Sequence, residues 1–297
     1  MVKAAYQGER GAFSEAAARK LLGDAADPVP HRTFDEMFDS VAVGRMDCLI
    51  APIENTLAGS VLKNYDLLET HRLTIIGETS LGIAHNLIAP RGVKFSQVKR
   101  VYSHPVALAQ CERFLRANPQ IDVAQAYDTA GSVKMIIENG RSDEAAIAGK
   151  FAAEVYGAEV LAEGVEDHHE NYTRFLLVSQ PSRAASIHVT TESADMKTTI
   201  VFRVANGPGA LFRALAAFAL RDIDLSKIES RPIEGRPWEY SFYLDILGDT
   251  ADSAIQKALA HLEELAESVR VLGCYRRAEP LASNNHANST TKGKMEA

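Results

Sequence analysis

Residues 101–148 read VYSHPVALAQCERFLRANPQIDVAQAYDTAGSVKMIIENGRSDEAAIA, and this stretch decides the fold class. Short apolar segments alternate in it with segments whose apolar residues recur at helical spacing. We expect strands at 101–103, 121–126 and 145–148, and helices that begin near Pro105 and after Thr129. Such alternation predicts an α/β fold with a mostly parallel sheet, in which ligands bind at the carboxyl ends of the strands.

The same alternation extends toward the N-terminus. Thr33 and Glu36 have the spacing of a helix capping box, and Gly23 has the position expected just after a helix end. Strands are predicted at 2–7, 47–52, 73–76 and 81–89, with helices at 13–22 and from Phe34. These elements belong to a large α/β body over residues 1–179.

The C-terminal third has a different order of predicted strands and helices. The polar stretch 180–196 is expected to be a linker, and residues 277–297, with few large apolar side chains, a disordered tail. Between them, residues 197–276 follow the order of a ferredoxin-like βαββαβ unit, whose open sheet face and edge strands favour pairing with a second copy. Its elements are expected at 197–204, 209–220, 224–231, 238–247, 251–265 and 269–275.

Composition excludes several classes of protein. The chain has 297 residues and a net charge of −7, which argues against a nucleic-acid partner but not against a small anionic substrate. No apolar run approaches the roughly 18 residues of a membrane span. Cys48, Cys111 and Cys274 lie far apart, which favours a reducing, cytoplasmic location. His168 and His169 are adjacent and should point apart, so no metal site is expected.

Polar clusters follow four of the predicted strands. Each of them alone is typical of an ordinary polar loop or helix cap, and none matches a known nucleophile, zinc or phosphate-loop motif. The clusters are 7–14, 51–60, 102–105 together with Gln110, and 171–175.

Together these clusters resemble one family, the prephenate dehydratases with a C-terminal ACT regulatory domain. The resemblance extends from about residue 4 to residue 276. The sequence at residues 6–8, 64–68 and 227–229 is also similar to that of plant arogenate dehydratases. The motifs that carry it are Pro52-Ile53-Glu54-Asn55-Thr56, Gly59-Ser60, Tyr102-Ser103-His104-Pro105, Asp128-Thr129-Ala130, Asn171-Tyr172-Thr173-Arg174-Phe175, Gly209-Ala210-Leu211 and Glu229-Ser230-Arg231-Pro232.

The resemblance implies a fold and an activity. The body would be a two-lobed catalytic domain like that of periplasmic binding proteins, with a middle lobe over about 80–160. It would convert prephenate to phenylpyruvate in phenylalanine biosynthesis, as a carbon–oxygen lyase that needs no cofactor. Such an enzyme must cradle a dianion and donate a hydrogen bond to the departing hydroxyl.

Roles for individual residues follow from the same resemblance. Thr173 is expected to donate to the leaving oxygen. Glu54 would hold a proton near neutral pH, or stay charged and orient its neighbours. Arg174 is expected to bind a substrate carboxylate. The remaining expected site residues are Asn55, Ser103 and Gln110 as orienting donors, and Ser60, Thr56, Phe175 and Asn171 in substrate binding.

The ACT unit is expected to bind phenylalanine and inhibit the enzyme. A loop at a helix N-terminus offers N–H groups to a carboxylate, and an acidic residue can hold the ammonium. We expect this binding between two units of a homodimer or homotetramer, favouring a less active arrangement. The residues implied are Asn206, Gly209, Ala210, Leu211, Glu229 and Ser230.

Two alternatives stay open. An arogenate dehydratase would share the fold and chemistry, because arogenate differs from prephenate only by an ammonium in place of a keto group. A non-catalytic amino-acid-sensing protein could use the same two-part architecture, although Glu54, Thr173 and Arg174 together disfavour it.

Overall fold

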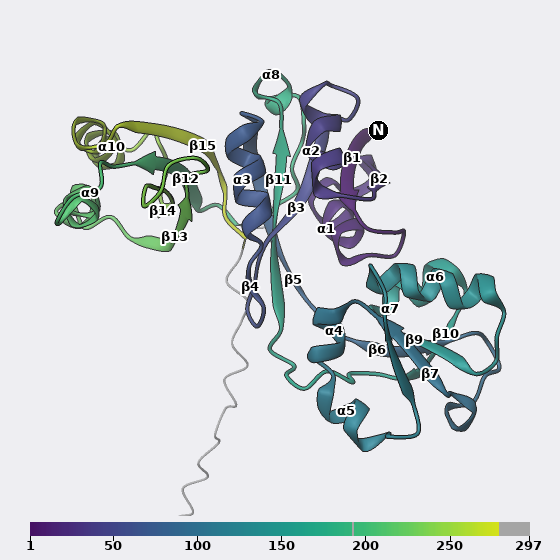
Figure 1. Cartoon of the computed structure of the whole chain (residues 1–297). Coiled ribbons are helices and arrows are strands. Elements are labelled where there is room, and N and C mark those ends of the chain that lie inside the picture. The colour runs from purple at the N-terminus through teal and green to yellow at the C-terminus, as the bar shows by residue number, and fades with distance from the viewer. Residues whose placement is uncertain (192, 279–297) are drawn as a thin grey trace, which may run out of the picture.

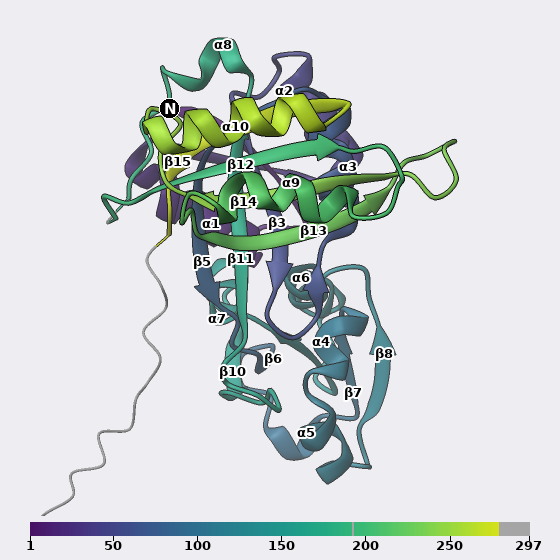
Figure 2. The same ribbon diagram turned by 90° about the vertical axis from the view of Figure 1, so that its left-hand side faces the viewer.

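The computed structural model describes residues 1–191 and 193–278 (Figure 1). Three sheets organise these residues: one in each lobe of the α/β body and one in the C-terminal unit. Figures 1 and 2 show the C-terminal unit beside the first lobe and the second lobe below it.

The first lobe is a mixed sheet in the order β2-β1-β3-β11-β5, with the short strand β4 pairing with β3. Helix α1 packs on one face, while α2 and α3 pack on the other. The strands are β1 (Val2–Gln7), β2 (Ala26–His31), β3 (Cys48–Asn55), β4 (Gly59–Ser60), β5 (Thr74–Gly82) and β11 (Tyr172–Ser179), and the helices α1 (Phe13–Leu22), η1 (Gly23–Ala25), α2 (Phe34–Ala42) and α3 (Leu62–Thr70).

The second lobe is a mixed sheet in the order β10-β6-β9-β7-β8. One face packs on the helix pair that follows β7, and the other faces α6 and the first lobe. The strands are β6 (Asn86–Ala89), β7 (Arg100–Ser103), β8 (Asp122–Gln125), β9 (Glu144–Ala148) and β10 (Glu159–Ala162), and the helices η2 (Phe95–Gln97), α4 (Pro105–Ala109), α5 (Glu112–Ala117), α6 (Thr129–Asn139) and α7 (Lys150–Tyr156).

The sheets are less parallel than the sequence predicted. The chain enters the second lobe after β5 and returns through β11, which lies antiparallel between β3 and β5. In the second lobe β6 is antiparallel to β9 and β10. Strand β2 was not predicted because Pro28 and Pro30 lie in it, and it is an edge strand, where proline is tolerated. The predicted α/β class is confirmed, with mixed rather than mostly parallel sheets.

The C-terminal unit is the predicted βαββαβ sheet. Its antiparallel order is β13-β14-β12-β15, and α9 and α10 cover one face around Phe202, Phe218 and Leu244. The elements are β12 (Met196–Arg203), α9 (Ala210–Ala219), β13 (Leu225–Pro232), β14 (Tyr240–Leu247), α10 (Ser253–Leu265) and β15 (Ser268–Arg276).

The other face of this sheet packs on the first lobe of the same chain. Val201, Tyr243, Leu272 and Tyr275 belong to one buried cluster with side chains of α2, α3 and β11. Strand β15 runs so close to β5 that a Cβ on Gly273 would collide with the carbonyl oxygen of Ile75. The face expected to be open is therefore covered within the chain.

The segment between the two domains is ordered against the first lobe. It contains α8 (Pro181–Ala184), buries Ile187, and donates from the Thr190 N–H to the Leu21 carbonyl at 2.8 Å. Of the expected tail, Arg277 and Ala278 contact Asp195 and Glu78, and residues 279–297 lie outside the described part. None of the helices described is long and apolar enough to cross a membrane.

Candidate active site

Asn55 and Thr173 form a hydrogen-bonded pair at the end of β3 and the start of β11. The two residues are direct neighbours in the sheet register, and Asn55 Nδ2 donates to Thr173 Oγ1 at 2.9 Å. The Asn55 Oδ1 atom accepts from the N–H groups of Leu57 and Ala58 at 3.0 and 2.8 Å, which fixes the orientation of the amide. The loop after β3 therefore aims a donor at the threonine hydroxyl.

Further amides continue this pair into the second lobe. Asn55 Nδ2 also donates to Asn171 Oδ1 at 2.7 Å, and Asn171 Nδ2 donates to Gln110 Oε1 at 3.0 Å. Gln110 lies at the end of α4, so the chain of hydrogen bonds connects the two lobes. Asn171 is fully buried and Thr173 is 9% exposed, which holds the network in a low-dielectric setting where such bonds are strong.

His85, which was not among the expected site residues, completes the network. Its Nε2 atom lies 2.9 Å from Gln110 Oε1, which can only accept, so Nε2 carries the proton. The Nδ1 atom has no partner within residues 1–191 and 193–278. Burial lowers the pKa of His85, which makes the imidazole neutral. A single histidine that follows strand β5 without a polar cluster gave no signal in the sequence.

A cavity lies beside this network between the lobes. It is open to solvent and has a volume of about 550 Å³, within the usual range for a small-molecule site. The ring of Phe13 lies edge-on to that of His85, with 6.2 Å between centroids, and also borders the cavity. Neither Asn55 nor Thr173 lines the cavity directly. Its lining is Phe13, Gly82, Ala84, Asn86, Lys150, Glu163, Gly164 and His169.

The loop after β1 holds the lobes together on another side. The Glu9 N–H donates to Asp128 Oδ2 at 3.2 Å, and the Glu9 carboxylate accepts from Tyr127 at 2.6 Å and Lys134 at 3.1 Å. Gly11 has φ +86°, and a Cβ there would lie 2.7 Å from the Cα of Ala152. The glycine-rich cluster thus allows close contact between lobes.

Three other expected site residues lie at the margin of this network or in the core. Ser103 is fully buried and donates to the Ile147 carbonyl at 2.6 Å, away from the amide network. Phe175 packs in the core shared by α1 and the first sheet. The Thr56 hydroxyl accepts from the Tyr172 N–H at 3.0 Å, which ties the loop after β3 to β11.

Glu54 and Ser60, both expected at the substrate, contact the ACT unit in this structure. Lys227 Nζ on β13 lies 2.9 Å from Glu54 Oε1 and 3.1 Å from Ser60 Oγ. Ser60 also donates to Glu229. The reason is the alternation of side chains along a strand: Glu54 and Asn55 are consecutive in β3 and point to opposite faces.

Arg174 also differs from the expectation of a substrate contact. Its guanidinium donates to Glu78 at 2.7 Å, to Asp245 at 2.5 Å and to the Tyr275 hydroxyl at 3.1 Å. Burial disfavours its charge, but Asp245, Tyr275 and Glu78 outweigh this and keep the pKa of Arg174 well above its ordinary value. Arg174 is thus a buried link to the ACT unit, with both carboxylate partners supplied by the protein.

Three of the residues expected to bind phenylalanine line one cavity. A cavity of about 110 Å³ is lined by Asn206, Ala210 and Leu211, together with Trp238 and Tyr240. Gly209, which precedes α9, has φ +74°. Glu229 and Ser230 lie on β13 outside this lining, and Glu229 points to Ser60. Among the described residues, no group of His, Cys, Asp and Glu could hold a metal ion.

Comparison with known proteins identifies the family of the chain. Residues 4–183 match the family described as prephenate dehydratase, and residues 198–264 match the ACT domain. The chain belongs to the prephenate dehydratase family. The family match makes the protein a carbon–oxygen lyase of phenylalanine biosynthesis with a C-terminal ACT regulatory domain.

Three relatives show the range of names in this family. The Arabidopsis thaliana chloroplastic arogenate dehydratase/prephenate dehydratase 2 is 44% identical over 92% of this chain and 72% of its own length. The Arthrobacter aurescens prephenate dehydratase, solved with L-Phe, is 34% identical with a TM-score of 0.83, covering 93% of this chain and 90% of that one. GqqA, described as a novel type of quorum quenching acylase, is 32% identical with a TM-score of 0.83, covering 93% and 98%.

Proposed function

We propose that Thr173 donates the hydrogen bond that lets the ring hydroxyl of prephenate depart. Asn55 uses an acceptor lone pair of Thr173 Oγ1, which leaves the threonine O–H free to donate. This hydrogen bond is the single observation that carries the proposal. No acceptor for that O–H is found in the part of the chain that the structure describes, so the leaving oxygen of a substrate can take it.

The reaction needs little from the protein beyond orientation and hydrogen bonds. The C–C bond to the ring carboxylate breaks and releases carbon dioxide. Its electron pair enters the ring, and the C–O bond to the ring hydroxyl breaks as water forms with one proton. Threonine is too weak an acid to supply that proton on its own, so Thr173 stabilises the departing oxygen while solvent delivers the proton. Neutral Gln110, Asn171 and His85 hold Asn55 in position.

The substrate would occupy the cavity between the lobes. Lys150 is the cation on its border, with Nζ 2.9 Å from Glu163, and a substrate carboxylate could take over that contact. A small rearrangement between the lobes would bring the ring hydroxyl to Thr173, since the lining already reaches Gly82, the register partner of Tyr172.

We infer that phenylalanine is the inhibitor and that it binds at the cavity near Asn206 and Leu211. A family member solved with L-Phe supports this proposal. A homodimer or homotetramer through the ACT units fits the unpaired edge of β13, together with the 77% exposure of Trp238 and 76% of Phe212. The three free cysteines fit a cytoplasmic location.

Arogenate is the second candidate substrate, favoured by the names of the plant relatives. The test offers prephenate and arogenate separately to the purified protein and measures phenylpyruvate and phenylalanine. We expect turnover of prephenate that Thr173→Ala abolishes and phenylalanine suppresses. A preference for arogenate would replace the substrate, and no turnover of either would favour the sensing protein.

A further inference from the structure

The residues next to Asn55 and Thr173 in the chain both face the ACT unit. Strands β3 and β11 pair Asn55 with Thr173, and Glu54 with Arg174. Consecutive residues of a strand point to opposite faces. The pair of Asn55 with Thr173 is therefore followed, one residue along each strand, by the pair of Glu54 with Arg174 on the opposite face. The two strands therefore present the proposed reaction site on one face and charged groups on the other.

The ACT sheet contacts Glu54 through Lys227. The side chain of Lys227 is 13% exposed, and its Nζ atom lies 2.9 Å from Glu54 and 3.6 Å from Glu229. Ser60 on β4, which pairs with β3, accepts from Lys227 and donates to Glu229. The end of β3 is thus held on its far side by β13.

The ACT sheet contacts Arg174 through a denser network. Asp245 on β14 accepts from Arg174 and, at 2.7 Å, from Thr199. Lys197 on β12 donates to Glu78 at 2.6 Å, and Glu78 in turn accepts from Arg174. Burial opposes ionisation of Asp245, but the charges of Arg174 and Lys197 outweigh it and lower the pKa of Asp245. The start of β11 is therefore held by permanent charges of the ACT sheet.

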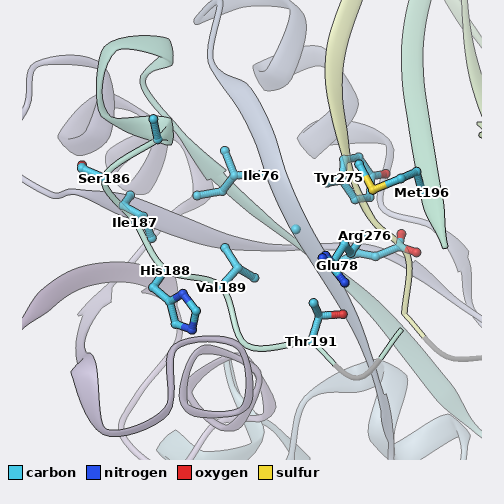
Figure 3. Close-up of a pocket in the computed structure, with 12 residues that line it drawn as sticks. Ile76, Glu78, Ser186, Ile187, His188, Val189, Thr191, Met196, Tyr275 and Arg276 are labelled. Atoms are coloured by element: carbon cyan, nitrogen blue, oxygen red, sulfur yellow. The ribbon is translucent and has the colours of Figure 1, made fainter. Parts of the chain in front are cut away.

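A cavity borders this charged junction. Figure 3 shows Glu78 from β5 and Tyr275 from β15 at the same opening, with Ile187 and Val189 of the segment between the domains on its other side. The cavity encloses about 530 Å³. At this end of the interface, the contacts of Arg174 with Glu78 and Asp245 lie beside the close packing of β15 on β5.

We propose that Glu54 and Arg174 are positioning residues through which the ACT sheet sets the hydrogen bond between Asn55 and Thr173. Neither touches the substrate in this role. Lys227 fixes the position of Glu54, and Asp245 fixes that of Arg174. Because Asn55 and Thr173 are the next residues in β3 and β11, the backbone of each strand fixes their positions in turn. The inference rests on the proposed function of Thr173, because only then does the geometry of that pair affect the reaction.

A double-mutant cycle between Lys227 and Glu54 tests the inference, with kcat and KM for prephenate as readouts. If Glu54 acts only through Lys227, then Lys227→Met lowers kcat about 10-fold with little change in KM, and adding Glu54→Gln lowers it no further. Lys227→Arg, which keeps the cation, should retain most of the wild-type kcat.

Asp66→Asn is the matched control. Asp66 on α3 accepts two hydrogen bonds from the Arg231 guanidinium, at 2.9 and 2.8 Å. The substitution therefore breaks an ion pair of the same interface, and this pair includes no residue of β3 or β11. It should leave kcat unchanged. Equal unfolding midpoints for Asp66→Asn and Lys227→Met would show that a loss of kcat is not a loss of folded protein.

Two results would overturn the inference. One is a Lys227→Met enzyme whose kcat stays within about 2-fold of wild type. The other is a Glu54→Gln change that lowers kcat by the same factor with and without Lys227, which would make Glu54 act on the substrate. Thr173→Ala in the same assay separates these failures from failure of the proposed site: if it keeps its kcat, the proposed function itself is wrong.

Discussion

The two faces of the β3–β11 strand pair differ in charge. Toward the inter-lobe side lie amides, a hydroxyl and a neutral imidazole: Asn55, Asn171, Thr173, Gln110 and His85. Toward the ACT unit lie charged side chains that are all paired within the protein. Glu78, Arg174, Lys197, Lys227 and Asp245 are largely buried, and Glu54 is partly exposed.

This difference has a physical reason. Neutral donors can be buried without partners of opposite charge, and they remain able to bind an anion and a departing oxygen. Buried charges need permanent partners, which a substrate that comes and goes cannot supply. On this pair of strands, a hydrogen-bond network of neutral side chains is backed by charges that are paired within the protein, while Lys150 at the border of the cavity supplies the cation for a substrate carboxylate.

The largest expected effect concerns the charged face. Arg174→Met would leave Asp245 and Glu78 short of their cation, so it should lower the free energy of unfolding by about 3–5 kcal/mol. Urea denaturation measures this loss, and Arg174→Lys should recover part of it. If the variant were as stable as wild type and only its KM for prephenate rose, Arg174 would be a substrate ligand after all.

The next effect concerns the neutral face. Thr173→Ala removes the proposed donor to the leaving oxygen, so kcat should fall by at least ~10²-fold. The unfolding free energy should change little, because Asn55 Nδ2 keeps its contacts with Asn171 Oδ1 and the Tyr172 carbonyl. Steady-state kinetics with prephenate measure the effect, and Thr173→Ser, which keeps the hydroxyl, is the control. A kcat near wild type in the alanine variant would remove Thr173 from the mechanism.

A smaller effect should separate structure from chemistry at Ser103. Its hydroxyl satisfies the buried Ile147 carbonyl, so Ser103→Ala should lower the unfolding free energy by about 1–3 kcal/mol. The kcat of the folded variant should stay near wild type, because Ser103 makes no bond to the amide network. A large fall in kcat without loss of stability would return Ser103 to the catalytic set.

The smallest effect is a pH dependence at His85. Burial lowers its pKa in the folded protein, so the unfolded chain binds more protons below the ordinary imidazole value of about 6.5. Stability should therefore decline as pH falls from about 6.5 toward the lowered pKa. Chemical denaturation across this range should give a flatter profile for His85→Gln. Identical profiles would mean that His85 is not buried in its neutral form.

The sequence predicted the elements well where local patterns determine them. The order of the ACT elements followed from local periodicity. A shared site for Asn55 and Thr173 was expected only from the family resemblance, because each polar cluster alone is typical of an ordinary loop. The face of the sheet to which Glu54 and Arg174 point could not be predicted, because it depends on which domain covers each face of the first sheet. His85 was missed because a single buried histidine gains its meaning only from Gln110, which comes from the other lobe.

The most direct test of the contrast between the two faces is a crystal structure of the enzyme with an unreactive analogue of prephenate that keeps the ring hydroxyl. We predict that the analogue lies between the lobes, with its ring hydroxyl oxygen within hydrogen-bond distance of Thr173 Oγ1 and with Arg174 still paired to Asp245. An analogue whose carboxylate binds Arg174 or Glu54 instead, on the ACT side of the sheet, would contradict the assignment of the reaction to the neutral face.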